Sequence, residues 1–216
     1  MSKTYKVKEC FLTLQGEGEF AGRAAVFVRF SGCNLWSGRE EDRGEGVGDC
    51  SKWCDTDFRG GTRYSLSALV AEVVRLWGTR AQHRRYVVLT GGEPGLQVDD
   101  ALIGALREAG FFIGIETNGT CLLPDGIDHI TVSPKGGLPL KVTTAHVLKL
   151  VYPQPDQTPA VWVALQRQGS VHFTHRFLQP LDGPDRESNT RLCVEYCLAH
   201  PEWALSLQTH KLLGIP

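Results

Sequence analysis

The sequence predicts an α/β fold: an abbreviated, open barrel of about six parallel strands with few helices. The strand-like runs are mostly continuous apolar stretches rather than alternating ones, which is typical of parallel strands covered on both faces. Helical patterns lie between these runs, which favours a parallel α/β sheet. They are fewer than the strands, and 216 residues are too few for a complete barrel of eight strand–helix units.

The expected strands follow one another along most of the chain. They occupy Ala24–Phe30, Tyr86–Thr90, Phe111–Glu116, His129–Ser133, His146–Val151, Val171–Leu178 and Trp203–Gln208.

Three segments between these strands have the pattern of helices. In Ser65–Trp77, apolar residues recur at helical spacing, Ser65 is a residue type that caps helix N-termini, and Gly78 follows as a stop signal. The same arrangement recurs in Asp99–Ala109. A third helix is expected over Asn189–His200, because Pro201 ends it. The segment around Trp162 looks like an insertion, and no role is assigned to it.

Length and charge narrow the class of protein. The chain fits a single domain over residues 1–216, and its net charge of -1 implies no broad attraction to nucleic acid or membranes. The N-terminal ten residues contain no apolar signal core, and no run reaches membrane-spanning length. We therefore expect a cytoplasmic protein with reduced thiols. Seven cysteines, an odd number, do not indicate a disulfide framework.

Three of the cysteines lie in one polar, glycine-rich loop. Cys33, Cys50 and Cys54 follow the Ala24–Phe30 run directly. Three thiolates in one loop suggest a metal or cluster site, and three rather than four suggest that one coordination position stays open for chemistry. The charged run at residues 39–45 within the loop mixes signs and is expected to be a solvated surface.

Four of the predicted strands end in polar or glycine-rich segments. These segments are Thr90-Gly91-Gly92-Glu93-Pro94, Glu116-Thr117-Asn118-Gly119, Ser133-Pro134-Lys135 and Gln179-Pro180-Leu181-Asp182-Gly183. The carboxyl ends of parallel strands share one rim, where ligands gather.

The residue types at this rim suit a polar ligand. Gly91 and Gly92 would let the backbone approach a ligand, with Glu93 near an ammonium group. Ser133 and Lys135 would suit a carboxylate or ribose hydroxyls. Any one segment alone is more simply an ordinary turn. Four in succession beside the cysteine loop favour a single binding site.

Taken together, these motifs resemble those of the radical S-adenosylmethionine enzymes. Their usual spacing is C-x3-C-x2-C, whereas here sixteen residues separate Cys33 from Cys50, and three separate Cys50 from Cys54. A long insertion between the first two cysteines is a feature of one branch, the 7-carboxy-7-deazaguanine synthase family. The extra residue before Cys54 could be absorbed by a bulge.

Further segments along nearly the whole chain match that branch. They are Leu14-Gln15-Gly16-Glu17-Gly18, Arg29, Cys54-Asp55-Thr56, the four strand-end segments, and Gln208-Thr209-His210-Lys211 through Pro216.

The resemblance implies the fold and the cofactors. The fold would be the open, partial TIM-like barrel of the radical S-adenosylmethionine type, with the cluster loop at residues 33–54 as an insertion. Cys33, Cys50 and Cys54 would hold a [4Fe–4S] cluster whose fourth iron binds S-adenosyl-L-methionine. Residues that would hold this cofactor are Gly92, Ser133, Pro134, Lys135, Gln179, Pro180, Leu181 and Asp182. Glu93 and Glu116 rank lower as contacts.

The implied substrate is 6-carboxy-5,6,7,8-tetrahydropterin, which the enzymes of this branch convert to 7-carboxy-7-deazaguanine and ammonia by ring contraction. Gln15 and Glu17 would address the pterin edge, and Arg29 would bind the carboxylate by a two-pronged ion pair. Further substrate contacts are implied for Leu14, Gly16, Thr90 and the terminal carboxylate at Pro216.

The resemblance also implies a magnesium ion and partners. Thr56 would give its hydroxyl to Mg²⁺, which takes few protein ligands and keeps several waters. The expected partners are an electron donor such as a flavodoxin and a second copy of the chain in a homodimer.

Two other functions remain open. One is a radical activase that acts on a protein partner. The other is a non-enzymatic zinc-binding module, which could use the three loop cysteines and one more ligand. Cys193 and Cys197 lie on one face of a predicted helix and could join Cys50 and Cys54 in a four-thiolate zinc site. Their apolar neighbours favour a core role instead, as for Cys10 and Cys121.

Overall fold

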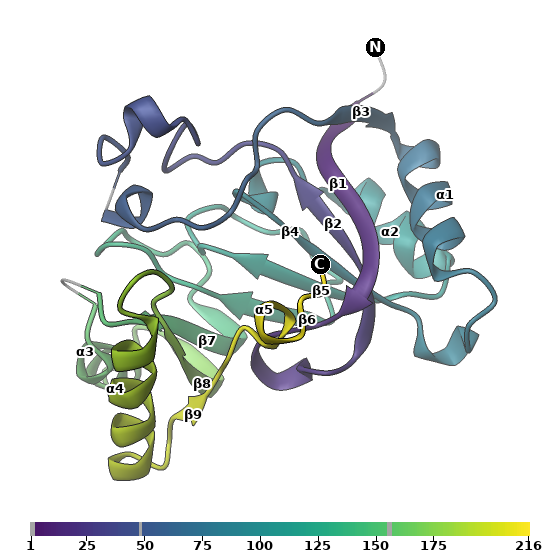
Figure 1. The fold of residues 1–216 in the computed structure, drawn as a ribbon. Helices are drawn as coiled ribbons and strands as arrows, with labels where there is room; N and C mark the ends of the chain where they lie inside the picture. Colours follow the sequence, from purple (N-terminus) through teal and green to yellow (C-terminus); the bar gives the residue numbers. More distant parts are fainter. Residues whose placement is uncertain (1–2, 48, 155–156) are drawn as a thin grey trace.

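The structure is a computed structural model, and it describes residues 3–47, 49–154 and 157–216. One nine-stranded sheet runs through the chain in the order β3-β1-β2-β4-β5-β6-β7-β8-β9 (Figure 1). The strands are β1 (Thr4–Leu14), β2 (Ala24–Phe30), β3 (Thr62–Ser65), β4 (Tyr86–Gly91), β5 (Phe112–Thr117), β6 (His129–Val132), β7 (Thr144–Tyr152), β8 (His172–Pro180) and β9 (Ala204–Leu205).

The sheet is mostly parallel and open. Every neighbouring pair from β2 to β9 is parallel, whereas β1 pairs antiparallel with β2 and β3 pairs antiparallel with β1. The order places β3 and β9 at opposite edges, so the sheet does not close. The predicted open α/β barrel is therefore confirmed, with seven consecutive parallel strands where about six were expected.

Few helices cover the sheet. They are α1 (Leu66–Trp77), α2 (Asp100–Glu108), α3 (Pro159–Arg167), α4 (Arg186–Ala199) and α5 (Thr209–Leu213). Figure 1 shows α1 and α2 on one side of the molecule and α3 and α4 on the other, with α5 between them. Short 3-10 helices occupy Gly18–Phe20, Glu40–Asp42, Asp49–Lys52, Gln82–Arg84 and Pro94–Leu96. None of the helices in the described ranges could cross a membrane.

Two apolar cores fix the halves of the sheet. The first lies between α1, α2 and strands β1, β2, β4 and β5, and includes the fully buried Leu69 and Leu102. The second lies under α3 and α4, where Trp162 and Cys193 pack against β7 and β8.

The first two predicted helices are confirmed, and their caps are as expected. Ser65 accepts from the backbone N–H of Ala68, and Asp99 accepts from that of Leu102.

Several elements differ from the sequence prediction. β1 was missed because its two buried residues, Tyr5 and Val7, alternate with less buried ones, as in an antiparallel strand near a sheet edge, and do not form the continuous apolar run of a covered parallel strand. The segment around Trp162, expected to be an insertion without a role, contains α3, and Pro159 in its first turn is the sequence signal for this helix. α4 begins three residues earlier than expected. Only Ala204–Leu205 of the last expected strand pairs, and α5 follows it.

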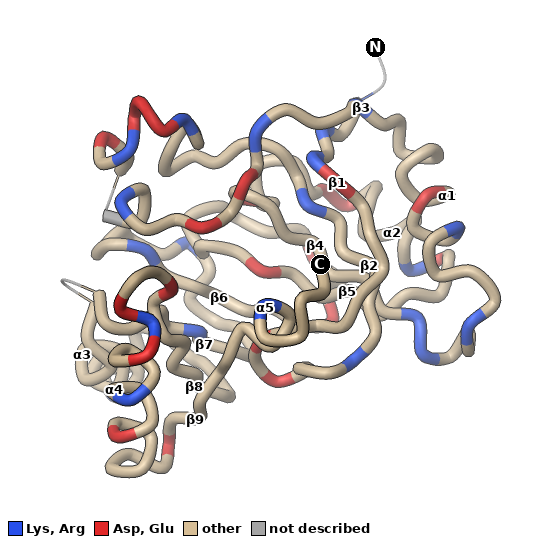
Figure 2. The backbone as a smooth tube through the Cα atoms, viewed as in Figure 1, with Lys and Arg blue, Asp and Glu red and all other residues tan. Residues whose placement is uncertain are grey.

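Acidic and basic residues are interspersed along the whole backbone (Figure 2). The segment at residues 39–45 mixes both signs, as expected, and most of its side chains are exposed. Arg43 pairs with Glu40 at 2.6 Å on this surface. Charges of both signs therefore lie close together in this part of the surface.

Candidate functional site

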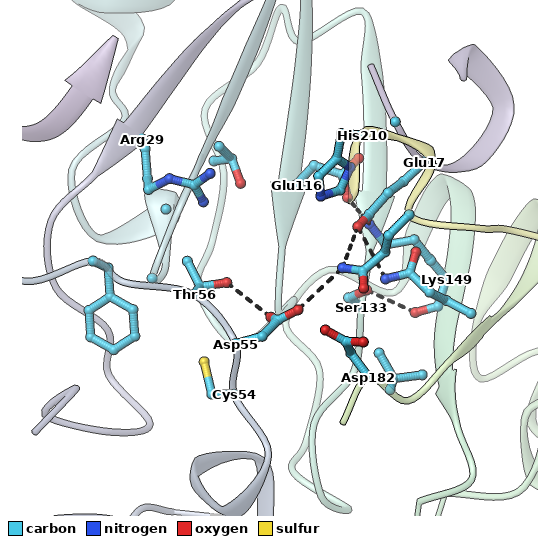
Figure 3. A pocket seen from close by; sticks show the side chains of 18 of the residues that line it. Glu17, Arg29, Cys54, Asp55, Thr56, Glu116, Ser133, Lys149, Asp182 and His210 are labelled. Carbon is cyan, nitrogen blue, oxygen red and sulfur yellow. Dashed lines mark hydrogen bonds and ion pairs between the residues drawn. The ribbon is translucent and has the colours of Figure 1, made fainter. Parts of the chain in front are cut away.

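One pocket lies at the carboxyl ends of the parallel strands, and we call it the central pocket (Figure 3). Of the residues predicted for the site, its wall includes Leu14, Gln15, Gly16, Glu17, Arg29, Cys33, Cys50, Cys54, Thr56, Thr90, Gly92, Ser133, Lys135, Gln179, Pro180, Leu181, Asp182 and Pro216. Pro134 is the exception, because it is buried behind this wall and does not line the pocket.

The cysteine loop is held in place by its own small apolar cluster. Trp36 and Phe58 are both buried and meet edge to face, with ring centroids 5.9 Å apart. The loop is tied to β1 and to residue 58 by backbone hydrogen bonds from Ser31 and Gly32. Arg43 donates to the carbonyl of Ser51 at 2.9 Å across the loop. These contacts fix a polar loop that contains only short 3-10 helices.

The unusual spacing before Cys54 is accommodated by a 3-10 helix. Cys50 lies in the helix Asp49–Lys52, and the N–H of Trp53 donates to the carbonyl of Cys50 at 3.2 Å. The extra residue is thus wound into a helical turn rather than absorbed by the bulge that was expected. All three thiols still border the central pocket.

The donor set at this wall fits a cluster better than a single ion. All seven cysteines are free, but no three His, Cys, Asp or Glu side chains in the described ranges converge tightly enough to hold one metal ion. In a [4Fe–4S] cluster each thiolate binds a different iron, so its ligands stand further apart than the ligands of one ion. Three thiols that share a pocket wall without converging meet that requirement.

Burial favours the protonated form of two of these thiols, Cys50 and Cys33, in the metal-free protein. It raises the pKa of Cys50 to about 11, although the nearby Lys135 ammonium partly offsets the effect. The pKa of Cys33 is raised by burial too, against the opposing effect of the Leu35 N–H that donates to its sulfur at 3.5 Å. A bound iron would displace both protons.

The two glycines at the end of β4 allow two backbone segments to approach each other closely. A Cβ at Gly92 would lie 2.2 Å from the carbonyl oxygen of Gly32, and one at Gly91 would lie 2.3 Å from that of Phe30. The backbone of β4 therefore runs against the start of the cysteine loop, where no side chain fits. This close approach is a second reason for glycine at these positions, and both residues also border the pocket.

Glu93 does not face a ligand, contrary to the expectation that it would lie near an ammonium group. It is fully buried, and its carboxylate accepts from the Thr117 hydroxyl and the Asn118 N–H, both at 2.7 Å, and from the Gly95 N–H. Burial raises its pKa, although these donors oppose the shift. Glu93 thus holds the segment after β4 against the end of β5, at the rim of the pocket.

The segment after β6 offers a cation beside the thiols. The Lys135 ammonium lies 5.1 Å from the centre of the Trp53 ring and forms no ion pair with a carboxylate within the described ranges. Burial lowers its pKa. Ser133 donates its hydroxyl to the carbonyl of Lys149 at 2.8 Å. Lys135 is therefore a positive group available to an anionic ligand.

The floor of the pocket carries a buried charge cluster that the sequence prediction missed. Lys149 on β7 pairs with Glu17 and with Glu116, the latter at 2.7 Å (Figure 3). Gln208 and Gln179 both donate to Glu17. The overlooked signal was a single charged residue inside the apolar run of β7.

The three ionisable groups shift one another. Burial raises the pKa of both carboxyls. For Glu17 the Lys149 ammonium, together with weaker contributions such as the hydrogen bond from Gln208, outweighs burial, so the pKa of Glu17 is lowered. For Glu116 burial prevails and its pKa is raised. The two carboxylates together raise the pKa of Lys149 against the effect of burial. The pocket floor therefore holds one cation between two carboxyl groups whose pKa values are shifted in opposite directions.

Of the predicted substrate residues, Leu14, Arg29 and Thr90 lie on β1, β2 and β4, and Gln15, Gly16 and Glu17 directly follow β1. Gln15 donates to Glu116 at 3.4 Å, and Arg29 donates to Glu9 at 2.7 Å from a position on the pocket wall. The Thr56 hydroxyl lies 3.5 Å from the Asp55 carboxylate (Figure 3).

The C-terminal segment completes the wall. Thr209 donates to the carbonyl of Gly16 through both its N–H and its hydroxyl, and a Cβ at Gly16 would meet the His210 ring at 2.2 Å. The Thr13 hydroxyl donates to Pro216 at 2.8 Å. His210 and Lys211 also line the pocket, although the sequence prediction gave them no role.

None of the other four cysteines lines this pocket. Cys193 is fully buried in the second core and points to the carbonyl of Tyr152 at 3.8 Å, and Cys197 packs at the edge of the same core. Cys10 packs on the first core, where burial raises its pKa to about 12. The core interpretation of these three cysteines is therefore confirmed.

Known proteins resemble this chain over nearly its full length. No protein-family model matches it. A 7-carboxy-7-deazaguanine synthase of Bradyrhizobium diazoefficiens is 54% identical over 98% of this chain and 99% of its own length. The synthase of Caulobacter vibrioides is 53% identical over 99% of this chain and 100% of its own length. The chain belongs to the 7-carboxy-7-deazaguanine synthase family.

The structural comparison agrees with this family. The crystal structure of QueE from Escherichia coli matches with a TM-score of 0.68 and 29% identity, over 94% of this chain and 93% of that one. Membership of the 7-carboxy-7-deazaguanine synthase family makes the chain an enzyme of the lyase class, with an iron–sulfur cluster and S-adenosyl-L-methionine as its cofactors.

Proposed function

We propose that this chain converts 6-carboxy-5,6,7,8-tetrahydropterin to 7-carboxy-7-deazaguanine and ammonia in queuosine and deazapurine biosynthesis. The observation that carries the proposal is the central pocket, where three thiols, the strand-end segments and the predicted substrate residues share one wall. The family supports the same reaction.

Cys33, Cys50 and Cys54 would hold the [4Fe–4S] cluster. When bound and reduced, the cluster would supply one electron for the cleavage of S-adenosylmethionine. The resulting 5′-deoxyadenosyl radical would take a hydrogen atom from C6 of the substrate. Around it, Gly92, Ser133–Lys135 and Gln179–Asp182 would hold the cofactor. The Lys135 ammonium supports a contact with the carboxylate of S-adenosylmethionine. Pro134 does not line the pocket and would act by positioning Ser133 and Lys135.

The substrate would lie between β1 and the buried charge cluster. Arg29 would bind its carboxylate, while Gln15 and Glu17 would bind the pterin edge. Lys149 holds Glu17 ionised, so this acceptor is ready for ring N–H donors without a further proton loss. Leu14, Gly16, Thr90 and Pro216 would add contacts. Burial of the charge cluster supports a site from which water is excluded.

A magnesium ion would bind the hydroxyl of Thr56 and keep most of its waters. The exposed Asp55 carboxylate 3.5 Å from this hydroxyl adds negative charge that supports a cation here. We also propose that residues 1–216 form one domain with the cluster loop at 33–54 as an insertion. The enzyme would work in the cytoplasm as a homodimer and take electrons from a donor such as a flavodoxin.

Anaerobic turnover tests the proposal. The protein is purified without oxygen, reconstituted with iron and sulfide, and incubated with reductant, S-adenosylmethionine and 6-carboxytetrahydropterin. We expect both 5′-deoxyadenosine and 7-carboxy-7-deazaguanine. 5′-Deoxyadenosine without the deazaguanine would favour the activase, and a colourless protein that retains zinc would favour the binding module; either result would overturn the proposal.

Arg29 and its partner Glu9 give a matched pair of variants. If Arg29 binds the substrate carboxylate, Arg29→Gln removes a charge-assisted contact and raises KM about 10-fold or more. Glu9→Gln breaks the same ion pair but leaves the guanidinium, so KM should stay nearly unchanged. Equal effects of the two variants would mean that the ion pair itself is what matters.

A further inference from the structure

Lys211 on α5 joins two carboxylates that come from distant parts of the chain. Its ammonium lies 2.5 Å from Asp55 Oδ2 and 2.6 Å from Asp182 Oδ2. Gln208, one turn earlier, also donates to Asp55 at 3.3 Å. Asp55 and Asp182 both border the central pocket (Figure 3). One side chain thus connects three walls of the site.

The two partners stand at sensitive positions. Asp55 lies between Cys54, which would bind the cluster, and Thr56, which would bind magnesium. Asp182 ends the segment after β8 that would hold S-adenosylmethionine. α5 itself is anchored on the opposite side of the pocket, where Thr209 donates twice to the carbonyl of Gly16. Lys211 therefore links α5 to the cysteine loop through Asp55 and to the segment that follows β8 through Asp182.

This arrangement contributes more to position than to stability. The Lys211, Asp55 and Asp182 side chains are 28%, 41% and 28% exposed, so water screens the attraction. Without the ammonium, two carboxylates that share one cation would repel each other across the pocket mouth. The other cation near Asp182, Arg186, is 4.0 Å away and more than half exposed. It is poorly placed to replace Lys211.

We propose that Lys211 is a positioning residue that fixes the cysteine loop against the cofactor segment, through Asp55 and Asp182. The proposal rests on the proposed function for its kinetic consequence. Its structural consequence can be measured without any cofactor. Loss of the ammonium should loosen the loop around residue 55 and displace the cluster and magnesium ligands relative to the cofactor.

Hydrogen–deuterium exchange on the cluster-free chain tests the structural part. In Lys211→Met, peptides that cover residues 49–58 and 181–184 should exchange faster than in the unchanged chain, while peptides from α1 and α2 should not change. The thermal midpoint should shift by no more than about 4 °C, because the ion pairs are partly exposed. Lys211→Arg keeps a cation with reach to both carboxylates and should restore slow exchange.

Kinetics on the reconstituted enzyme test the functional part. Lys211→Met should assemble the cluster but lower kcat/KM for S-adenosylmethionine by about 10-fold to 100-fold, the scale of a small misplacement at a reacting centre. Lys211→Arg should recover most of this loss. Arg186→Met removes the cation that lies 4.0 Å from Asp182, and its kcat/KM should equal that of the wild-type enzyme.

Unchanged exchange in Lys211→Met, unchanged kcat/KM, or the same losses in Arg186→Met would each overturn the proposal. A fall of the thermal midpoint that accounts for the whole kinetic loss would do so as well. Failure of the unchanged enzyme to form 5′-deoxyadenosine would instead count against the proposed function, and the exchange experiment would still decide whether Lys211 holds the loop.

Discussion

Lys149 is the residue on which the pocket floor depends. It is 5% exposed and pairs with two carboxylates that have little access to water. Lys149→Met should therefore leave two buried acids uncompensated and lower the free energy of unfolding by about 3–5 kcal/mol. Urea unfolding of the cluster-free protein measures this change. Substrate affinity should fall as well, because Glu17 would then take up a proton more readily.

A surface lysine provides the control for this substitution. Lys141→Met changes the same residue type at an exposed position and should alter the free energy of unfolding by no more than about 0.5 kcal/mol. If Lys149→Met were as mild as Lys141→Met, the two carboxylates would have to be neutral in the folded protein. That result would contradict the ionised Glu17 inferred from the structure.

At the scale of single residues, the sequence could predict which groups meet but not what holds them. The predicted thiols and strand-end residues border one pocket, since β-strand ends are recognisable and share a rim. The backbone contact of Gly92 and the burial of Glu93 were not foreseen, because each depends on a neighbour far along the chain: Gly32 for one and Thr117 for the other. Such approaches leave no local pattern.

At the scale of elements, the two helix caps are unequal. Ser65 caps α1 with a single hydrogen bond from Ala68. Asp99 caps α2 and also accepts from the hydroxyl of Tyr5, a side chain that is 1% exposed, at 2.7 Å. We expect Ser65→Ala to cost about 1 kcal/mol and Asp99→Ala about 2–3 kcal/mol, because the latter also strands a buried hydroxyl.

Denaturant unfolding of both variants measures the difference. Asp99→Ala combined with Tyr5→Phe removes the stranded hydroxyl and should recover part of the loss. Equal costs for the two alanine variants would show that the Tyr5 hydroxyl gains nothing from Asp99.

Elements with strong local signals were predicted well and the others were not. α1 and α2 begin where Ser65 and Asp99 indicate, since a cap and a periodic apolar face lie within one segment. α5 has no buried residue and depends on its contact with Gly16, so its own sequence gives little indication of a helix. Tertiary contact decides such short elements.

At the scale of the whole molecule, stability should fall in mild acid. His129 is buried against Phe20, Glu19, His146 and His175, and burial lowers its pKa although Glu19 opposes the shift. Below about pH 6.5 the unfolded chain binds a proton that the folded chain binds less readily. The stability is complete above that pH and is lost as the pH falls towards the folded pKa.

Unfolding free energies between about pH 5.5 and 8 measure this loss. His129→Gln should flatten the slope but not abolish it, because the pKa of His210 is also lowered by burial. His83 is exposed, so His83→Gln should leave the slope as it is. A slope that stays the same in His129→Gln would show that this ring does not carry the effect.

The pocket wall joins the beginning of the described chain to its end. Thr13 bonds to Pro216, and Gly16 to Thr209, across 203 and 193 positions. Such contacts form late, because a long loop must close before they contribute. During synthesis the cysteine loop and the sheet up to β8 can fold first, with the pocket open on the side that α5 later covers. Iron and sulfide would then reach the thiols more easily before α5 docks than after it has docked.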